Sequence, residues 1–169
     1  MDILKVVLRL IHIYGGILWV GGALLMNFFV APSMRAIGDS GKQFAGHLLT
    51  KTRFTQVMTG SAYATVIAGF LLYGMDSQWF KSAWQSSGPG IGFGIGALFA
   101  LVGVITGIMN GNNNRKMGQL GAQIQGKPTP EQVSQLGAIQ KQQGWVVPAN
   151  TYSLILAVVF MAIARYLAF

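Results

Sequence analysis

The chain has 169 residues, of which 52% are hydrophobic and only 9% are charged. A soluble domain usually carries about 25% charged residues, so the composition excludes an ordinary soluble domain and predicts a bilayer as the solvent. Cysteine is absent, which excludes disulfides, cysteine-ligated iron–sulfur clusters and covalently attached c-type haem. The net charge is +8, but the basic residues are scattered between apolar segments. We therefore predict contacts with membrane lipid and no nucleic-acid partner.

Four apolar segments are long enough to cross a hydrocarbon core of about 30 Å, which needs about 20 residues of helix. In chain order they cover residues 6–30, 57–75, 91–109 and 147–167. We therefore predict an all-α fold, in which a single transmembrane domain forms a four-helix bundle with both termini on the same side.

Two of the three connections between these segments contain local signals. The connection 31–56 includes the semi-polar stretch GKQFAGHLLTKTRFTQ, which we expect to form a helix leading into the second span. The connection 76–90 ends in SSGPG, a combination that breaks helices.

The third connection, residues 110–145, is the longest and opens with the low-complexity stretch NGNNNRK. It also contains a helix start, with Thr129 at the N-cap, Pro130 at the first helical position and Gln132 two residues further on. We expect Gly144 to end this helix.

The distribution of Lys and Arg predicts the orientation. Connections 31–56 and 110–145 carry eight of these residues, and the other side carries four. Because basic loops stay in the cytoplasm, we place these two loops there and both termini outside, in a multi-pass protein of the bacterial inner membrane.

Small residues recur on one face of the third span, at Gly88, Gly92, Gly96 and Ala100. Close packing, and not burial of apolar surface, holds helices together in lipid. We predict that these glycines pack helices within the chain, with a homodimer face or room for a flat cofactor as alternatives.

Polar residues cluster near the same ends of three spans. They are Asn27, Gln56, Thr59, Asn150 and Thr151. We interpret them as a structural seam of interhelical hydrogen bonds, in preference to a substrate path.

His12 is the candidate functional residue. It lies six residues past the start of the first span, and Met161 lies six residues before the end of the fourth, so both are expected at one depth. Arg9 and Arg165 lie one turn nearer to solvent. This set fits a b-type haem, with His12 and Met161 as axial ligands and the arginines at the propionates.

Two other interpretations of the same residues stay open. Imidazole and thioether from His12 and Met161 also suit Cu(I) as metal ligands. Alternatively no cofactor is bound, His12 hydrogen-bonds to a carbonyl or to another helix, and Arg9 and Arg165 reach the lipid headgroups.

The stretch LIHIYGGILWVGGALLMNFFVAPSM, with its His-x6-Trp-x-Gly-Gly spacing, and the ending ARYLAF carry a resemblance. They resemble small bacterial four-helix membrane proteins, which include copper-resistance D-like domains and the haem-containing membrane family of protoporphyrinogen oxidase type. In the haem-containing relatives the histidine of the first helix is an axial ligand, so the resemblance implies this role for His12. The chain has no lysine within a span to match the second functional position of the oxidase, so neither activity carries over.

Catalytic motifs are otherwise missing from the sequence, and the four acidic residues lie far apart in loops, so we lean against an enzyme. We favour a haem b protein with a role in electron transfer or in support of a redox assembly. The alternatives are a non-enzymatic accessory subunit of a larger membrane complex, docked through the third span, and a copper-handling protein. Self-association into a homo-oligomer stays open.

Overall fold

The computed structural model describes residues 2–124 and 126–168, and all regular structure in these residues is helical. The helices are α1 (Ile3–Leu25), α2 (Ala31–Ala36), α3 (Asp39–Lys51), α4 (Phe54–Asp76), α5 (Gly88–Gln123) and α6 (Pro130–Ile163), with a π-helical segment at Met26–Val30 and 3-10 turns at Ala83–Ser86 and Ala164–Tyr166. Within the described residues, four helical stretches are long and apolar enough to cross a membrane: Ile3–Ala36, Phe54–Asp76, Gly88–Gln123 and Pro130–Tyr166. The predicted all-α membrane fold is confirmed.

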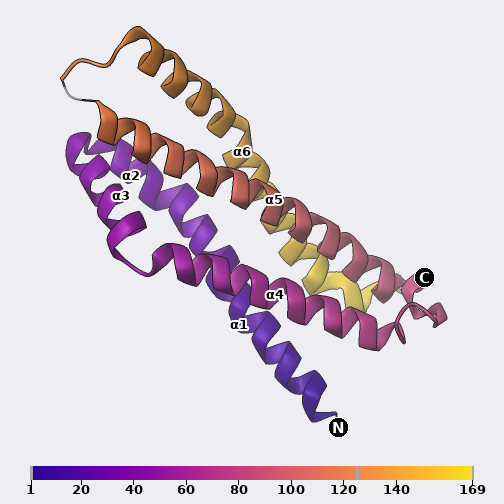
Figure 1. Cartoon of the computed structure of the whole chain (residues 1–169). Coiled ribbons are helices and arrows are strands. Elements are labelled where there is room, and N and C mark those ends of the chain that lie inside the picture. Colours follow the sequence, from indigo (N-terminus) through magenta and orange to yellow (C-terminus); the bar gives the residue numbers. More distant parts are fainter. Residues whose placement is uncertain (1, 125, 169) are drawn as a thin grey trace.

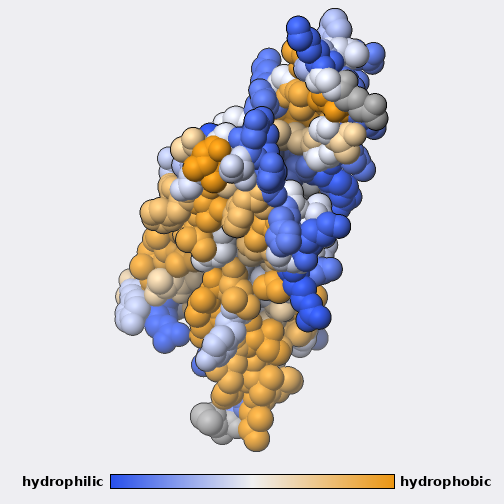
Figure 2. Space-filling view, turned by 90° about the vertical axis from the view of Figure 1, so that its left-hand side faces the viewer, coloured by the Kyte–Doolittle hydropathy of each residue, from blue (hydrophilic) through white to orange (hydrophobic). Residues whose placement is uncertain are grey.

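The four long helices form two antiparallel pairs, as Figure 1 shows. α1 packs along α4 and α5 packs along α6, whereas fewer contacts join the two pairs. On the face shown in Figure 2, the middle and lower parts are mainly apolar, whereas hydrophilic residues gather at the upper end and extend down the right-hand side. A surface of this kind suits a chain whose outer face is solvated by lipid.

Both termini lie at one end of the bundle, as the sequence predicts (Figure 1). Lys5 Nζ lies 2.8 Å from Asp76 Oδ1, and this ion pair joins the start of α1 to the end of α4. A methyl group on Gly88 would collide with Leu167, so the last turn of the chain lies beside the start of α5. We call this the terminal end and the opposite one the basic end.

The connection 31–56 is largely helical. α1 passes through the π-helical segment directly into α2, and α3 then folds back toward the start of α4. Gly38 makes the reversal possible because it adopts φ +60°, a conformation that side chains with a Cβ rarely tolerate. The helix expected in GKQFAGHLLTKTRFTQ is confirmed as α3.

The predicted 110–145 loop is replaced by a helical hairpin. α5 continues to Gln123, α6 begins at Pro130, and only residues 124–129 separate them. The capping box at Thr129 and Gln132 is confirmed, because Thr129 N donates to Gln132 Oε1 over 2.9 Å and Gln132 N donates to Thr129 Oγ1 over 3.3 Å.

The prediction that Gly144 ends this helix is wrong, because α6 runs unbroken to Ile163. Glycine within a helix costs only about 1 kcal/mol, and packing of α6 along α5 outweighs that cost. The SSGPG breaker, in contrast, marks a real boundary. Ser87 caps α5, and Pro89 lies in its first turn.

Candidate functional site

His12 lies in the interface between α1 and α4. It shares one face of α1 with the buried residues Leu8, Gly15 and Trp19, which follow a spacing of three and four residues. His12 Nδ1 is 2.7 Å from the carbonyl oxygen of Thr65. A carbonyl oxygen can only accept a hydrogen bond, so Nδ1 carries the proton that it donates to Thr65, and Nε2 takes no part in this bond.

The backbone of α4 supports the imidazole ring from one side. A methyl group on Gly69 would lie 2.7 Å from Cε1 and 2.8 Å from Nδ1 of His12, so the ring rests directly on this glycine. Thr65 Oγ1 in turn donates to the carbonyl oxygen of Ser61 over 2.7 Å. His12 is therefore held in one orientation by contacts with a single neighbouring helix.

Met161 belongs to the other helix pair. A methyl group on Gly96 of α5 would lie 3.2 Å from both Cγ and Cε of Met161, so this side chain packs between α5 and α6. Arg9 and Arg165 are exposed, in α1 and in the last 3-10 turn respectively. The structure thus places His12 against α4 and Met161 against α5, in pairs that share few contacts.

The glycines of the third span pack α5 against α6, as predicted. A methyl group on Gly92 would lie 2.9 Å from Cα of Ala164, and one on Gly103 would lie 2.6 Å from Cδ2 of Leu154. Trp19 approaches the same point from α1, 3.8 Å from that position on Gly103. These faces are filled by side chains of the chain itself, so they supply no room for a macrocycle.

The predicted polar seam forms in part. Asn27, within the π-helical segment, donates from Nδ2 to Thr151 Oγ1 over 2.8 Å. Asn150 Nδ2 donates to the carbonyl oxygen of Gly103 over 2.8 Å and lies 3.2 Å from Thr106 Oγ1. The π-helical segment, a rare geometry, thus contacts α6 through the hydrogen bond from Asn27 to Thr151.

Two expected members of the seam lie elsewhere. Gln56 and Thr59 are exposed on α4. The seam therefore joins the π-helical segment, α5 and α6, and Thr106 of α5 takes part where α4 was expected to do so. Among residues 2–124 and 126–168, no three His, Asp or Glu side chains lie close enough together to hold a metal ion.

Three of the four long helical stretches extend past the start of α4 at the basic end (Figure 1). At 1.5 Å per residue, the stretches Ile3–Ala36, Gly88–Gln123 and Pro130–Tyr166 are about 50–55 Å long, whereas α4 is about 34 Å long. The length of α4 matches a hydrocarbon core of about 30 Å, and the other three stretches are longer than that core by about 20 Å. We call the projecting part, residues 31–53 and 110–145, the basic stub, because it holds eight basic and two acidic residues.

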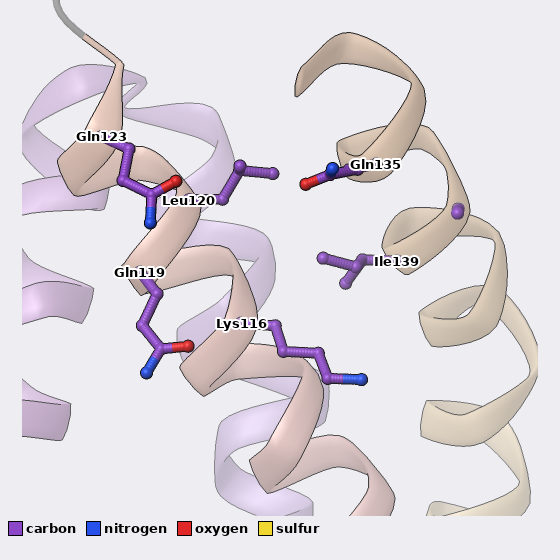
Figure 3. A pocket seen from close by; sticks show the side chains of 7 residues that line it. Lys116, Gln119, Leu120, Gln123, Gln135 and Ile139 are labelled. Carbon is purple, nitrogen blue, oxygen red and sulfur yellow. The ribbon is translucent and has the colours of Figure 1, made fainter. Parts of the chain in front are cut away.

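One groove of the basic stub lies between the ends of α5 and α6. It has a volume of about 340 Å³ and is lined mainly by amide and aliphatic side chains. Figure 3 shows Lys116, Gln119, Leu120 and Gln123 on one helix and Gln135 and Ile139 on the other, with open space between them. We call it the amide groove.

A second groove lies between α2 and α3, and we call it the aromatic groove. It has a volume of about 320 Å³ and is almost wholly apolar. Its lining residues are Phe29, Val30, Ser33, Met34, Ile37 and Phe44. Gly41 of α3 lies directly against the backbone of Met34, and this close approach holds the two walls together.

The sequence analysis offered a carbonyl as one alternative for the partner of His12, and the hydrogen bond to Thr65 bears this out, but the sequence did not identify Thr65 and gave no prediction of the grooves. The carbonyl oxygen of Thr65 leaves no trace in the side-chain pattern, because every residue has such an acceptor. The aromatic groove did leave a signal, since Phe29 and Phe44 are large apolar residues on either side of a charged, glycine-containing turn.

Comparison with known proteins adds no assignment. No protein-family model, curated protein or solved structure matches this chain. The resemblance of residues 10–34 to copper-resistance D-like and haem-containing membrane proteins therefore stays a prediction.

Proposed function

We propose that this multi-pass membrane protein is a non-enzymatic accessory subunit, which holds a partner protein at the membrane through its basic stub. One observation carries the proposal. Three of the four apolar stretches are longer than a bilayer core requires, and past the start of α4, at the basic end, they form a helical surface with two open grooves.

The form of the stub supports a binding role. Ordering these residues costs about 1–2 kcal/mol each in backbone entropy, and a span needs no such extension to cross lipid. Both arms of the hairpin are helical, and the capping box of Thr129 and Gln132 fixes the start of α6. The glycine face of the third span packs against α6 and the last turn of the chain, which favours the stub over that face as the docking surface.

The proposal is tested on the complete chain, solubilised from its native membranes in a mild detergent. We expect it to migrate as a complex with a different protein, at a mass well above that of the 18.1 kDa chain. Removal of residues 113–141, with a short glycine linker in their place, should release the chain from part or all of this complex. Migration as a monomer, or as copies of this chain alone, contradicts the proposal.

A second candidate function is binding of a b-type haem, or of Cu(I), at His12. The supporting observation is the hydrogen bond from His12 Nδ1 to the carbonyl oxygen of Thr65, which orients the ring and leaves Nε2 available to coordinate a metal ion. Metal-bound histidines are commonly held by such a bond from the second nitrogen to a carbonyl. A bound haem would supply one-electron chemistry, and His12 would fix its position at the α1–α4 pair.

The residues fit one axial ligand better than two. Met161 packs on Gly96 in the other helix pair, so a ligand pair of His12 and Met161 needs the two helix pairs to meet at this depth. The test is the visible spectrum of the purified protein with and without dithionite. A Soret band lost in His12→Ala and kept in His47→Ala supports haem at His12, whereas a colourless wild-type protein excludes it.

Copper is separated from haem by metal analysis of the same samples. We expect bound copper to fall in His12→Ala and to stay unchanged in His47→Ala, since His47 is exposed on α3. Equal copper content in the two variants excludes a site at His12.

A further inference from the structure

The charges that flank α4 locate the two edges of the hydrocarbon core. Residues 54–75 contain no charged side chain, and they are flanked by Arg53 and Asp76. At 1.5 Å per residue α4 is about 34 Å long, which is close to the core thickness of about 30 Å. Charged groups are costly within the core, so we place Arg53 at one edge and the ion pair of Asp76 with Lys5 at the other. The turn that joins α4 to α5 therefore begins at the interface between lipid and water.

One face of α4 is apolar and turned away from the rest of the chain. Tyr63, Ile67 and Phe70 are each more than half exposed. Their spacing of four and three residues puts them on one stripe of the helix, and Gly74 is the next position on that stripe. On a helix that crosses a bilayer, an exposed apolar stripe is solvated by acyl chains.

The turn after α4 folds an aromatic side chain back onto this stripe. A methyl group on Gly74 would lie 2.8 Å from Cζ3 of Trp79, so the indole ring fills the space over this glycine. The ring also meets Phe70 edge to face, with 6.4 Å between the two ring centroids. Trp79 itself is 53% exposed, so it continues the outward stripe to the edge of the core.

The backbone of the turn adopts a strained conformation in this arrangement. Gln78, Trp79 and Phe80 have φ angles of 51°, 56° and 68°, in the left-handed region that L-residues avoid. The buried Ser77 stabilises the turn, because its Oγ donates to the carbonyl oxygen of Gly74 over 3.2 Å and accepts from the backbone N–H of Phe80 over 3.1 Å. Strain of this kind persists only where the surroundings fix it, and it is concentrated at functional positions.

The second exposed aromatic residue of the turn is supported by both helices. Phe80 is 53% exposed, and its ring centroid lies 6.0 Å from that of Tyr73. Tyr73 also packs edge to face on Trp84, with centroids 5.2 Å apart, and its hydroxyl donates to the carbonyl oxygen of Gly90 over 3.2 Å. The turn thus presents two outward aromatic rings on a support formed by the end of α4 and the start of α5.

We propose that residues 77–82 form an interfacial anchor, with the rings of Trp79 and Phe80 inserted among the glycerol and headgroup layer of the phospholipid leaflet at the terminal end. Indole rings favour this layer because they combine an apolar body with a polar N–H. Lys81, the next residue, is exposed and carries the charge that lipid phosphates attract. Anchors of this kind set the depth and tilt of membrane helices, so the turn would fix α4 and α5 relative to the bilayer. The inference does not depend on the proposed accessory role.

Insertion can be measured with single cysteines, because the chain has no cysteine of its own. A nitroxide label on Phe80→Cys, in nanodiscs of phosphatidylcholine, is exposed to oxygen, which concentrates in lipid, and to a nickel chelate, which stays in water. Ile67→Cys on the outward stripe and Lys127→Cys in the exposed turn after α5 are the references for hydrocarbon and for water.

We expect the ratio of oxygen collisions to nickel collisions at position 80 to lie between the two references. A ratio equal to either reference overturns the proposal, because the turn then lies in water or deep in the core. A label that neither reagent reaches overturns it too, since the turn is then covered by protein.

A second measurement keeps both rings of the native turn. Tryptophan fluorescence is recorded with lipids that carry bromine near the glycerol end or near the methyl end of their acyl chains, and the difference between the wild type and Trp79→Phe isolates the signal of Trp79. We expect bromine near the glycerol end to quench this signal more strongly. Stronger quenching by the deeper bromine, or no quenching by either lipid, overturns the proposal.

A matched pair of variants tests whether α4 positions the ring. In Gly74→Ala the new methyl group meets the ring of Trp79, whereas a methyl group on Gly60, also in α4, has open space around it. Gly74→Ala should displace the indole and reduce its preference for the shallow bromine, and Gly60→Ala should leave that preference unchanged. Equal quenching in the two variants overturns the proposed anchor, because Trp79 is then not held against α4.

Discussion

Replacing Asn113 by leucine is expected to stabilise the hairpin of α5 and α6. Asn113 is 97% buried, with a relative exposure of 3%, and its Nδ2 has no hydrogen-bond partner within the described part of the chain. Gln143 Oε1 is also buried without a hydrogen-bond partner among the described residues, although Gln143 Nε2 donates to Asn114 Oδ1 over 2.9 Å. A buried polar group without a partner costs about 1–3 kcal/mol, and an apolar side chain of similar size removes that cost.

The expected gain can be measured by hydrogen exchange of the backbone amides of residues 114–123 in nanodiscs. A gain of about 1–3 kcal/mol slows exchange through local opening by roughly 5- to 150-fold. Asn112→Leu is the matched control, because Asn112 is exposed and adjacent to Asn113. Faster or unchanged exchange in Asn113→Leu would refute the reasoning, since Nδ2 must then be satisfied in the native protein.

Three further outcomes are expected. Gly15→Ala should lower the free energy of unfolding by about 1–3 kcal/mol, because its methyl group would lie 2.5 Å from a side-chain oxygen and 3.0 Å from a backbone oxygen of α4. Gly21→Ala, with open space around it, should leave the free energy of unfolding unchanged. Equal thermal unfolding of the two variants would contradict the packing of α1 on α4. A double-mutant cycle with Lys5→Met and Asp76→Asn should give a coupling free energy of about 1 kcal/mol or less, since both side chains are about one-third exposed. A coupling free energy that does not weaken in high salt would show that the pair is more buried than the structure indicates. Lys127→Cys, in a chain with no other cysteine, should react with a membrane-impermeant maleimide only from the cytoplasmic side, and labelling of intact cells from outside would reverse the predicted orientation.

The spans were predictable because a bilayer imposes a simple demand on the sequence. Three of the four predicted segments lie within a membrane-crossing stretch, and the fourth, 147–167, ends one residue past Pro130–Tyr166. The predicted return of both termini to one end follows from an even number of crossings. The helical ends were less predictable. NGNNNRK is a weak helix-former by composition, yet it is part of α5 because it packs along α6.

The candidate site was predicted as a set of residues but not as an arrangement. Depth along a helix follows from counting, so His12 and Met161 could be put near the same end. The direction in which each side chain points depends on which helices become neighbours. Because α1 pairs with α4 and α5 pairs with α6, His12 contacts Thr65 and Gly69 of α4, and Met161 contacts Gly96 of α5.

The sequence by itself determined the solvent, the number of crossings and the uneven charge of the two ends, because hydropathy and charge are properties of each residue alone. The tertiary structure decided which helices pair, where the glycines are used, and that the long connections are ordered helices enclosing two grooves. These features depend on contacts between residues far apart in the chain. In lipid, such contacts are stabilised by close packing of complementary surfaces, which composition does not encode.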